Sequence, residues 1–197
     1  MSLKHRFSSF QSSLGTLFSS LPLTPNQITF SALFFALIGL YFALQLSALF
    51  SLLFFILAGA ADAIDGAVAR ARKSATAHGA YIDGMVDRLV EFCLILSLSF
   101  FALPHFIIPI ALSLLLILFF GSCMTSFATA YASHRKVADA RKIASQPGIL
   151  ARAERLILLF ASLALVPFCP SCASALLFIG ACLSLLTFAQ RFAHYSK

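Results

Sequence analysis

The sequence has no tryptophan and very little charge. Only 11% of its 197 residues are charged and just 7 are acidic, whereas 60% are hydrophobic. Soluble domains are about 45–50% apolar and roughly 25% charged, so this balance excludes an ordinary soluble domain and is typical of a membrane protein. The apolar runs follow one another without a polar domain between them, and we predict a single membrane domain over residues 1–197.

The fingerprints of several common enzyme classes are also missing. The chain contains no P-loop, no Rossmann glycine motif and no pattern typical of a Ser-His-Asp hydrolase. Its net charge is +7, but the basic residues are scattered at the ends of apolar runs instead of lying among stacking aromatics. We therefore expect no nucleic-acid partner.

A single C-x-x-C pair, Cys169 and Cys172, is the only close pair of cysteines. A zinc ribbon needs a second pair, so the motif does not indicate a zinc site. A local disulfide is one alternative, but we favour an ordinary loop, and the sequence leaves the redox state of the two cysteines open.

The apolar residues recur with helical spacing along the whole chain. In residues 1–21, Phe7, Phe10 and Leu14 share one face opposite Lys4 and Arg6, which predicts an amphipathic helix on the membrane surface. After it, each apolar run is long enough to cross or nearly cross a bilayer. We predict an all-α integral membrane protein in which residues 22–197 form six transmembrane helices: 28–46, 48–73, 80–101, 104–132, 154–166 and 173–189.

The basic residues orient this bundle. All lysines and arginines fall on one side of the six crossings, whereas the opposite turns, residues 45–47, 103–106 and 167–171, contain none. By the positive-inside rule, both termini and the charged stretches lie in the cytoplasm. We therefore expect a multi-pass protein of the cell membrane.

Five of the seven acidic residues lie between Asp62 and Glu91. Asp62 and Asp65 are three residues apart on one predicted helix, and Asp83 and Asp87 are four apart on the next, so each pair shares a helical face. Four carboxylates at one end of two neighbouring helices are costly unless they are compensated. Oxygen ligands suit hard divalent cations, which predicts a Mg²⁺ or Mn²⁺ site; the alternative is a structural ion network with nearby arginines and lysines.

Residues around the acids suit phosphate chemistry. Gly66 and Gly79 remove side chains where a ligand would approach, Arg70 lies two turns after Asp62, and Thr76 offers a hydroxyl. A divalent-cation transporter is the main competing class, but it would place acids near the bilayer midplane with polar residues leading to both faces. The apolar outer halves of these helices disfavour transport.

The acidic stretch resembles the signature of a known family. The motif D-x-x-D-G-x-x-A-R begins at Asp62 and, after eight residues, is followed by G-x-x-x-D-x-x-x-D, which begins at Gly79. This pattern is similar to that of the CDP-alcohol phosphotransferases, which have an amphipathic helix and six membrane helices. The resemblance implies that two divalent ions are held by Asp62, Asp65, Asp83 and Asp87, and that Asp87 is also the general base.

The resemblance further implies a reaction and its donor. Such an enzyme joins the phosphate of a CDP-linked lipid, diacyl or archaeol, to a small alcohol and releases CMP, and it is expected to be a homodimer. The segment that enters the first predicted crossing also looks like that of the family. The residues expected to bind the CDP-lipid are Pro25, Asn26, Gln27, Ile28, Gly66, Ala69, Arg70, Thr76 and Gly79.

The acceptor is suggested by features outside the signature. Arg88 after Asp87, and the opening of the fifth predicted helix, resemble the inositol-phosphate branch of the family. We expect myo-inositol phosphate as acceptor, with glycerol 3-phosphate, serine or another alcohol as alternatives, and Glu91 as a partner of Arg88. The candidate ligands of an acceptor phosphate are Arg88, Arg135, Lys136, Arg141, Lys142, Arg152 and Arg155.

Overall fold

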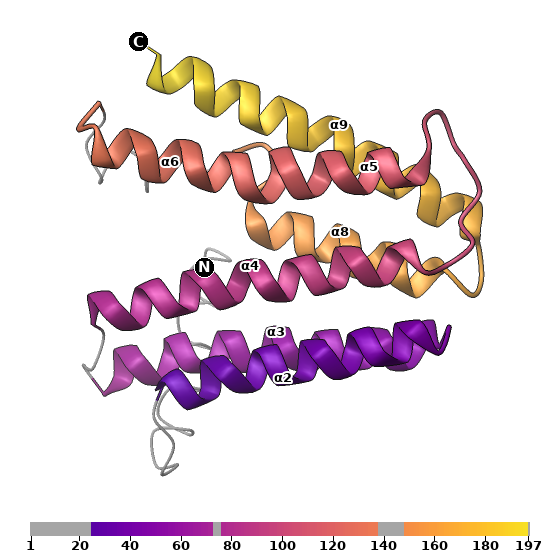
Figure 1. Ribbon diagram of the computed structural model, residues 1–197, viewed down its shortest axis with the longest axis horizontal. Coiled ribbons are helices and arrows are strands. Elements are labelled where there is room, and N and C mark those ends of the chain that lie inside the picture. The colour runs from indigo at the N-terminus through magenta and orange to yellow at the C-terminus, as the bar shows by residue number, and fades with distance from the viewer. Residues whose placement is uncertain (1–24, 73–75, 138–147, 197) are drawn as a thin grey trace, which may run out of the picture. The chain divides into compact units, whose positions relative to one another are not determined.

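The computed structural model describes residues 25–72, 76–137 and 148–196. It describes the side chains of these residues except for residues 25, 26 and 69–71. Every regular element in these ranges is a helix, which confirms the predicted all-α class (Figure 1). The predicted amphipathic helix at residues 1–21 lies outside the described residues. The helices are α2 Pro25–Leu44, α3 Ala48–Ala71, α4 Ala77–Ser99, α5 Ile110–Leu116, the π-helix η1 Ile117–Met124, α6 Thr125–His134, α8 Arg152–Leu165 and α9 Pro170–Tyr195.

The fourth predicted helix begins later than expected. Residues 104–109 are not helical, and Pro109 instead precedes the first turn of α5. A helix through this position would lose the hydrogen bond of residue 109, because proline has no N–H, and the proline ring would meet the carbonyl of His105. The predicted start at Pro104 is therefore wrong, whereas α5, η1 and α6 form one continuous run to His134.

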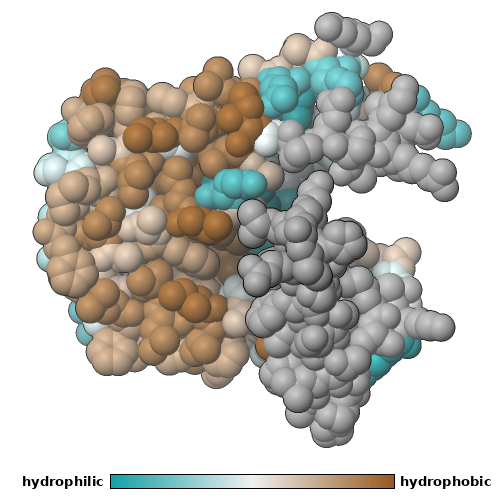
Figure 2. Space-filling view, turned by 180° about the vertical axis from the view of Figure 1, so that it is seen from behind, coloured by the Kyte–Doolittle hydropathy of each residue, from teal (hydrophilic) through white to brown (hydrophobic). Residues whose placement is uncertain are grey.

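Four helical segments are long and apolar enough to cross a membrane: α2, α3, the run Ile110–His134 and α9. The helix α4 carries Asp83, Asp87, Arg88 and Glu91 within its 23 residues, and α8 has only 14 residues, about 21 Å at 1.5 Å per residue. The molecule is thus a membrane protein. Figure 2 shows hydrophobic side chains spread over much of the visible surface, as lipid contact requires.

The chain divides into two compact units: the first includes the residues up to Phe42 and Phe50–Leu94, and the second includes Ala43–Leu49 and the residues from Ile95 onward. In the first unit, α2, α3 and the part of α4 up to Leu94 run in alternating directions (Figure 1). Ala32 and Ala36 are buried on α2, and Gly39 continues this small-residue face. A Cβ atom at Gly39 would lie 3.0 Å from the ring of Phe55, so the glycine allows α3 to approach closely.

In the second unit, α9 packs against α5, η1, α6 and α8. Ile117, Leu159, Leu163 and Leu177 are fully buried here and form its apolar centre. Gly180 lets α9 approach α8, because a Cβ atom there would lie 2.9 Å from Leu158.

The loop before α9 differs from the expectation. Cys169 and Cys172 form a disulfide, which is the alternative that the sequence favoured less than an ordinary loop. Pro170 begins α9, and the first helical turn brings the two Cα atoms to 5.3 Å. That separation is within the range a disulfide spans. The sequence pattern did not reveal that the helix begins between the two cysteines.

Candidate metal centre and substrate site

Three carboxylates meet at one end of the first unit. Asp62 lies on α3, and Asp83 and Asp87 lie one turn apart on α4. One carboxylate oxygen from each residue lies within 4.8 Å of the other two. The spacing of four residues on α4 places both of its acids on the face that meets Asp62.

Asp65 borders these three acids from the next turn of α3. Its side chain is 4% exposed and accepts a hydrogen bond of 2.6 Å from the hydroxyl of Thr29 on α2. Asp83 and Asp62 are its charged neighbours. Thr29 thus connects α2 to the acidic cluster and fixes one oxygen of Asp65.

Sequence analysis missed Thr29, although its neighbours 25–28 were singled out. Thr29 is a polar residue only 5% exposed within an apolar helix. Buried polar groups need a hydrogen-bonding partner, so such a position indicates contact with another polar residue. Which residue that is depends on how α2 packs on α3, and the sequence does not give that packing.

The cluster is unfavourable without a cation. Two carboxylate oxygens within 4.8 Å of each other repel by at least about 3.5 kcal/mol at an effective dielectric constant of 20. Asp87 is only 9% exposed, so water screens it poorly. An all-oxygen, acidic ligand set of this kind fits Mg²⁺ or Mn²⁺ and would not select a softer metal.

The predicted donor-binding residues lie at the beginning of α2, in the second half of α3 and at the start of α4. Thr76 precedes α4, and its hydroxyl accepts a hydrogen bond of 3.0 Å from the backbone N–H of Gly79. Thr76 therefore caps α4 and fixes the start of the helix that carries Asp83. Gln27 is exposed and Ile28 is buried at the beginning of α2, and Gly66 follows Asp65. Pro25 and Asn26 lie in α2, and Ala69 and Arg70 in α3, with side chains outside the described set.

Arg88 and Glu91 form an ion pair on α4, as expected from the sequence. The Nη1 atom of Arg88 lies 3.8 Å from an Oε atom of Glu91. Glu91 is fully buried, whereas 33% of the Arg88 side chain is exposed. Arg88 directly follows Asp87 in the sequence.

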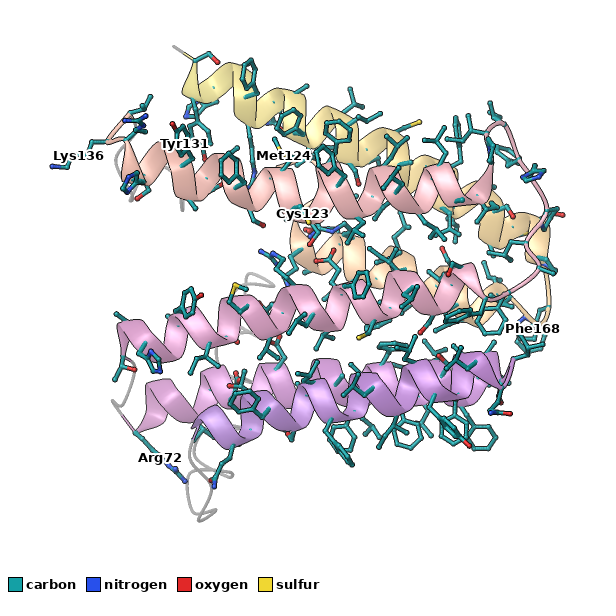
Figure 3. The ribbon with its side chains drawn as sticks, viewed as in Figure 1. Arg72, Cys123, Met124, Tyr131, Lys136 and Phe168 are labelled. Atoms are coloured by element: carbon teal, nitrogen blue, oxygen red, sulfur yellow. A yellow bond between two sulfur atoms is a disulfide. The ribbon has the colours of Figure 1, made fainter. Side chains whose placement is uncertain are left out.

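The remaining predicted acceptor residues belong to the second unit or fall outside the described residues. Arg155 is 3% exposed in the first turn of α8, and Arg152 is half-buried. Arg135 is exposed; its Nε donates to the Tyr131 hydroxyl at 3.0 Å, and its guanidinium lies over the Tyr131 ring. Lys136 is exposed after α6, and Figure 3 shows its side chain directed away from the helix. Arg141 and Lys142 lie outside the described residues.

Arg191 on α9 is a basic residue that the sequence did not single out. Its Nη1 donates to the carbonyl of Thr125 at 3.1 Å and to the hydroxyl of Thr129 at 2.7 Å. Gly148 leaves room for the side chain of Thr187 on α9, with which a Cβ atom at this position would clash. The contacts join α9 to α6, and helical spacing alone did not predict them.

Comparison with known proteins agrees with this geometry. Residues 22–187 match the family model described as CDP-alcohol phosphatidyltransferase. The chain is 32% identical over 150 residues to the archaetidylinositol phosphate synthase of Pyrococcus horikoshii, covering 75% of this chain and 72% of that protein. It is 37% identical over 75 residues to the human CDP-diacylglycerol–inositol 3-phosphatidyltransferase, covering 38% of this chain and 35% of that protein.

Solved structures show the same fold. The phosphatidylinositol phosphate synthase PgsA1 of Mycobacterium tuberculosis with CDP-DAG bound superposes with a TM-score of 0.78 at 21% identity, covering 94% of this chain and 92% of that one. The same protein in complex with manganese and citrate gives 0.79, covering 95% and 89%. The chain belongs to the CDP-alcohol phosphatidyltransferase family. It is a metal-dependent membrane transferase of phospholipid biosynthesis.

Proposed function

We propose that the protein transfers a phosphatidyl-type group, diacyl or archaeol, from a CDP-linked lipid to myo-inositol phosphate and releases CMP. The observation that carries the proposal is the meeting of Asp62, Asp83 and Asp87 at the junction of α3 and α4. Relatives named for inositol phosphate and inositol transfer support the acceptor. Glycerol 3-phosphate, serine and other small alcohols are the alternative acceptors.

In the proposed mechanism the four aspartates hold two divalent ions. When bound, these ions neutralise the charge of the donor diphosphate and of the departing CMP. Thr29 keeps Asp65 oriented through its hydroxyl. Asp87, buried and at the cluster, takes the proton from the acceptor hydroxyl. The acceptor oxygen then forms a bond to the lipid-side phosphorus as the bond from that phosphorus to CMP breaks.

The donor site is proposed to lie around the same cluster. Thr29 connects the first turns of α2 to Asp65, which supports a role for the neighbouring residues of α2 in holding the cytidine portion. Gly66 next to Asp65, and Gly79 one turn before Asp83, leave the backbone accessible beside the acids. The proposed donor contacts are Pro25, Asn26, Gln27, Ile28, Gly66, Ala69, Arg70, Thr76 and Gly79.

The proposed acceptor site uses basic side chains against the phosphate. Arg155 and Arg152 support this role because both lie in the first turn of α8, where Arg155 is 3% exposed and Arg152 is half-buried. The fork of donors on arginine matches phosphate oxygens. The proposed acceptor ligands are Arg88, Arg135, Lys136, Arg141, Lys142, Arg152 and Arg155.

The proposed topology has six crossings. Two of them are α4, which is less apolar than the four long apolar segments, and α8, which is shorter than these. The absence of lysine and arginine from the turns at 45–47, 103–106 and 167–171 supports cytoplasmic termini and a cytoplasmic active site. Residues 1–21 are proposed to lie on the membrane surface, and the protein to act as a homodimer.

The test measures CMP release by the purified protein in liposomes with CDP-diacylglycerol or CDP-archaeol and Mn²⁺. Each reaction receives one acceptor: inositol phosphate, inositol, glycerol 3-phosphate or serine. We expect the fastest release with inositol phosphate. A higher rate with another alcohol would replace the proposed acceptor, and no release with any of them would refute the proposed transferase function.

A further inference from the structure

Glu91 is a buried acid that the proposed chemistry does not use. It lies four residues after Asp87 and eight after Asp83, so it extends their face of α4 by one turn into an apolar run. It is 0% exposed. A buried charge costs several kcal/mol unless it is well paired, and apolar residues of similar size often serve stability better. Packing alone therefore does not explain a glutamate here.

One charged partner of Glu91 is Arg88, whose Nη1 lies 3.8 Å from an Oε atom of Glu91. This distance is longer than the roughly 2.7–2.9 Å of a close charge-assisted hydrogen bond. The carboxylate thus attracts the guanidinium without a short contact between these two atoms. The guanidinium of Arg88 thus lies on the side of Glu91, while a third of its side chain stays exposed.

The direction matters because helical side chains normally lean toward the N-terminus of their helix. For Arg88 this would be toward Gly84, one turn earlier, where a Cβ atom would meet nothing within 4 Å among the described residues. In the structure the guanidinium instead lies toward the C-terminal side of Arg88, near the buried Glu91. The space at Gly84, which follows Asp83, therefore stays open. Glycine within a helix costs about 0.5–1 kcal/mol of stability relative to alanine, so stability does not favour a glycine at this position.

An anionic acceptor meets an electrostatic problem at this site. The carboxylates of Asp62, Asp83 and Asp87 repel its phosphate, so a fixed positive charge is needed beside the reacting hydroxyl. On α4, Arg88 directly follows Asp87 and carries such a charge. An arginine whose direction is already set loses less conformational freedom when the phosphate binds.

We infer that Glu91 is a positioning residue, whose carboxylate orients Arg88 to bind the anionic group of the acceptor alcohol beside Asp87. The inference rests on the proposed function and deepens it, because it selects a phosphorylated acceptor over a neutral one at this position. Glu91 itself does not touch the substrate.

The experiment compares steady-state CMP release by the wild type, Glu91→Gln, Arg88→Gln and the double variant. Inositol phosphate, inositol and the CDP-lipid are varied in turn with Mn²⁺ present. Glu91→Gln raises the KM for inositol phosphate roughly tenfold, the scale of a 1.4 kcal/mol interaction. Its KM for CDP-lipid and its kcat stay within about twofold of the wild type. Glu91→Asp restores part of the loss.

The double variant tests whether Glu91 acts through Arg88. We expect its KM for inositol phosphate to equal that of Arg88→Gln, because Glu91 has nothing to orient once Arg88 is gone. Cys93→Ala is the control for a general disturbance of α4, since Cys93 is buried two residues further along. We expect this control to leave the KM for inositol phosphate unchanged.

Three results would overturn the inference: an unchanged KM for inositol phosphate in Glu91→Gln, an equal rise in the KM for CDP-lipid, or additive effects in the double variant. If Glu91→Gln does not fold, Arg88→Gln carries the test, and a KM for inositol phosphate equal to that of the wild type in that variant would also overturn the inference. These outcomes leave the wild type active. A wild type that releases no CMP with any acceptor would instead refute the proposed function and the inference together.

Discussion

The hydrogen bond from Thr29 to Asp65 offers a focused test of how α2 supports the metal site. Thr29→Val keeps the size of the side chain but removes the hydroxyl that donates to Asp65 at 2.6 Å. A hydrogen bond to a charged group contributes about 1.5–3 kcal/mol, which corresponds to roughly a 10- to 150-fold change in an equilibrium constant. Groups that orient metal ligands typically change metal affinity by about 10–100-fold.

The assay is CMP release by Thr29→Val at increasing Mn²⁺ concentration. We expect the Mn²⁺ concentration for half-maximal activity to rise by at least about tenfold, because the buried carboxylate of Asp65 loses its orienting donor. Thr29→Ser keeps a hydroxyl and is the matched control, with a value close to that of the wild type. An unchanged Mn²⁺ requirement in Thr29→Val, or an equal loss in Thr29→Ser, would refute this reasoning.

Three further predictions address the metal, a helix contact and a helix cap. Removing divalent ions with EDTA abolishes CMP release, and added Mg²⁺ or Mn²⁺ restores it; activity that persists in EDTA contradicts the metal site. Gly39→Leu overpacks the contact with Phe55 and lowers the stability by about 1–3 kcal/mol, seen as a lower Tm, whereas Leu37→Ala on the exposed face has a smaller effect. Thr76→Ala removes the cap of α4 and costs about 1 kcal/mol, measured by faster hydrogen exchange at the Gly79 amide, while Thr76→Ser retains protection.

Much of the acidic site follows from the sequence because helical geometry is regular. Once residues 62–65 and 83–87 are assigned to neighbouring helices, spacings of three and four residues place each pair of acids on one face. The structure then brings one oxygen of Asp62, Asp83 and Asp87 within 4.8 Å of each other. The pairing of Arg88 with Glu91 also follows from spacing within a single helix, and the structure confirms it.

Contacts between helices are harder to predict, because they depend on packing and rotation. Thr29 lies 36 residues before its partner Asp65, and Arg191 lies 66 residues after Thr125. Local breaks were also missed: Pro109 delays the fourth predicted helix, and the early start of α9 joins Cys169 to Cys172. In each case the deciding feature is tertiary geometry or the position of one proline, neither of which apolar periodicity reports.

The central claim is that Asp87 deprotonates the acceptor at a metal centre built from α3 and α4. Its most direct test is CMP release by Asp87→Asn, with saturating Mn²⁺, CDP-lipid and inositol phosphate, after Tm has shown that the variant is folded. The account predicts a fall of about 100-fold or more relative to the wild type, since a general base contributes about 10²–10⁴-fold and asparagine cannot take the proton. A rate for Asp87→Asn close to that of the wild type would contradict it.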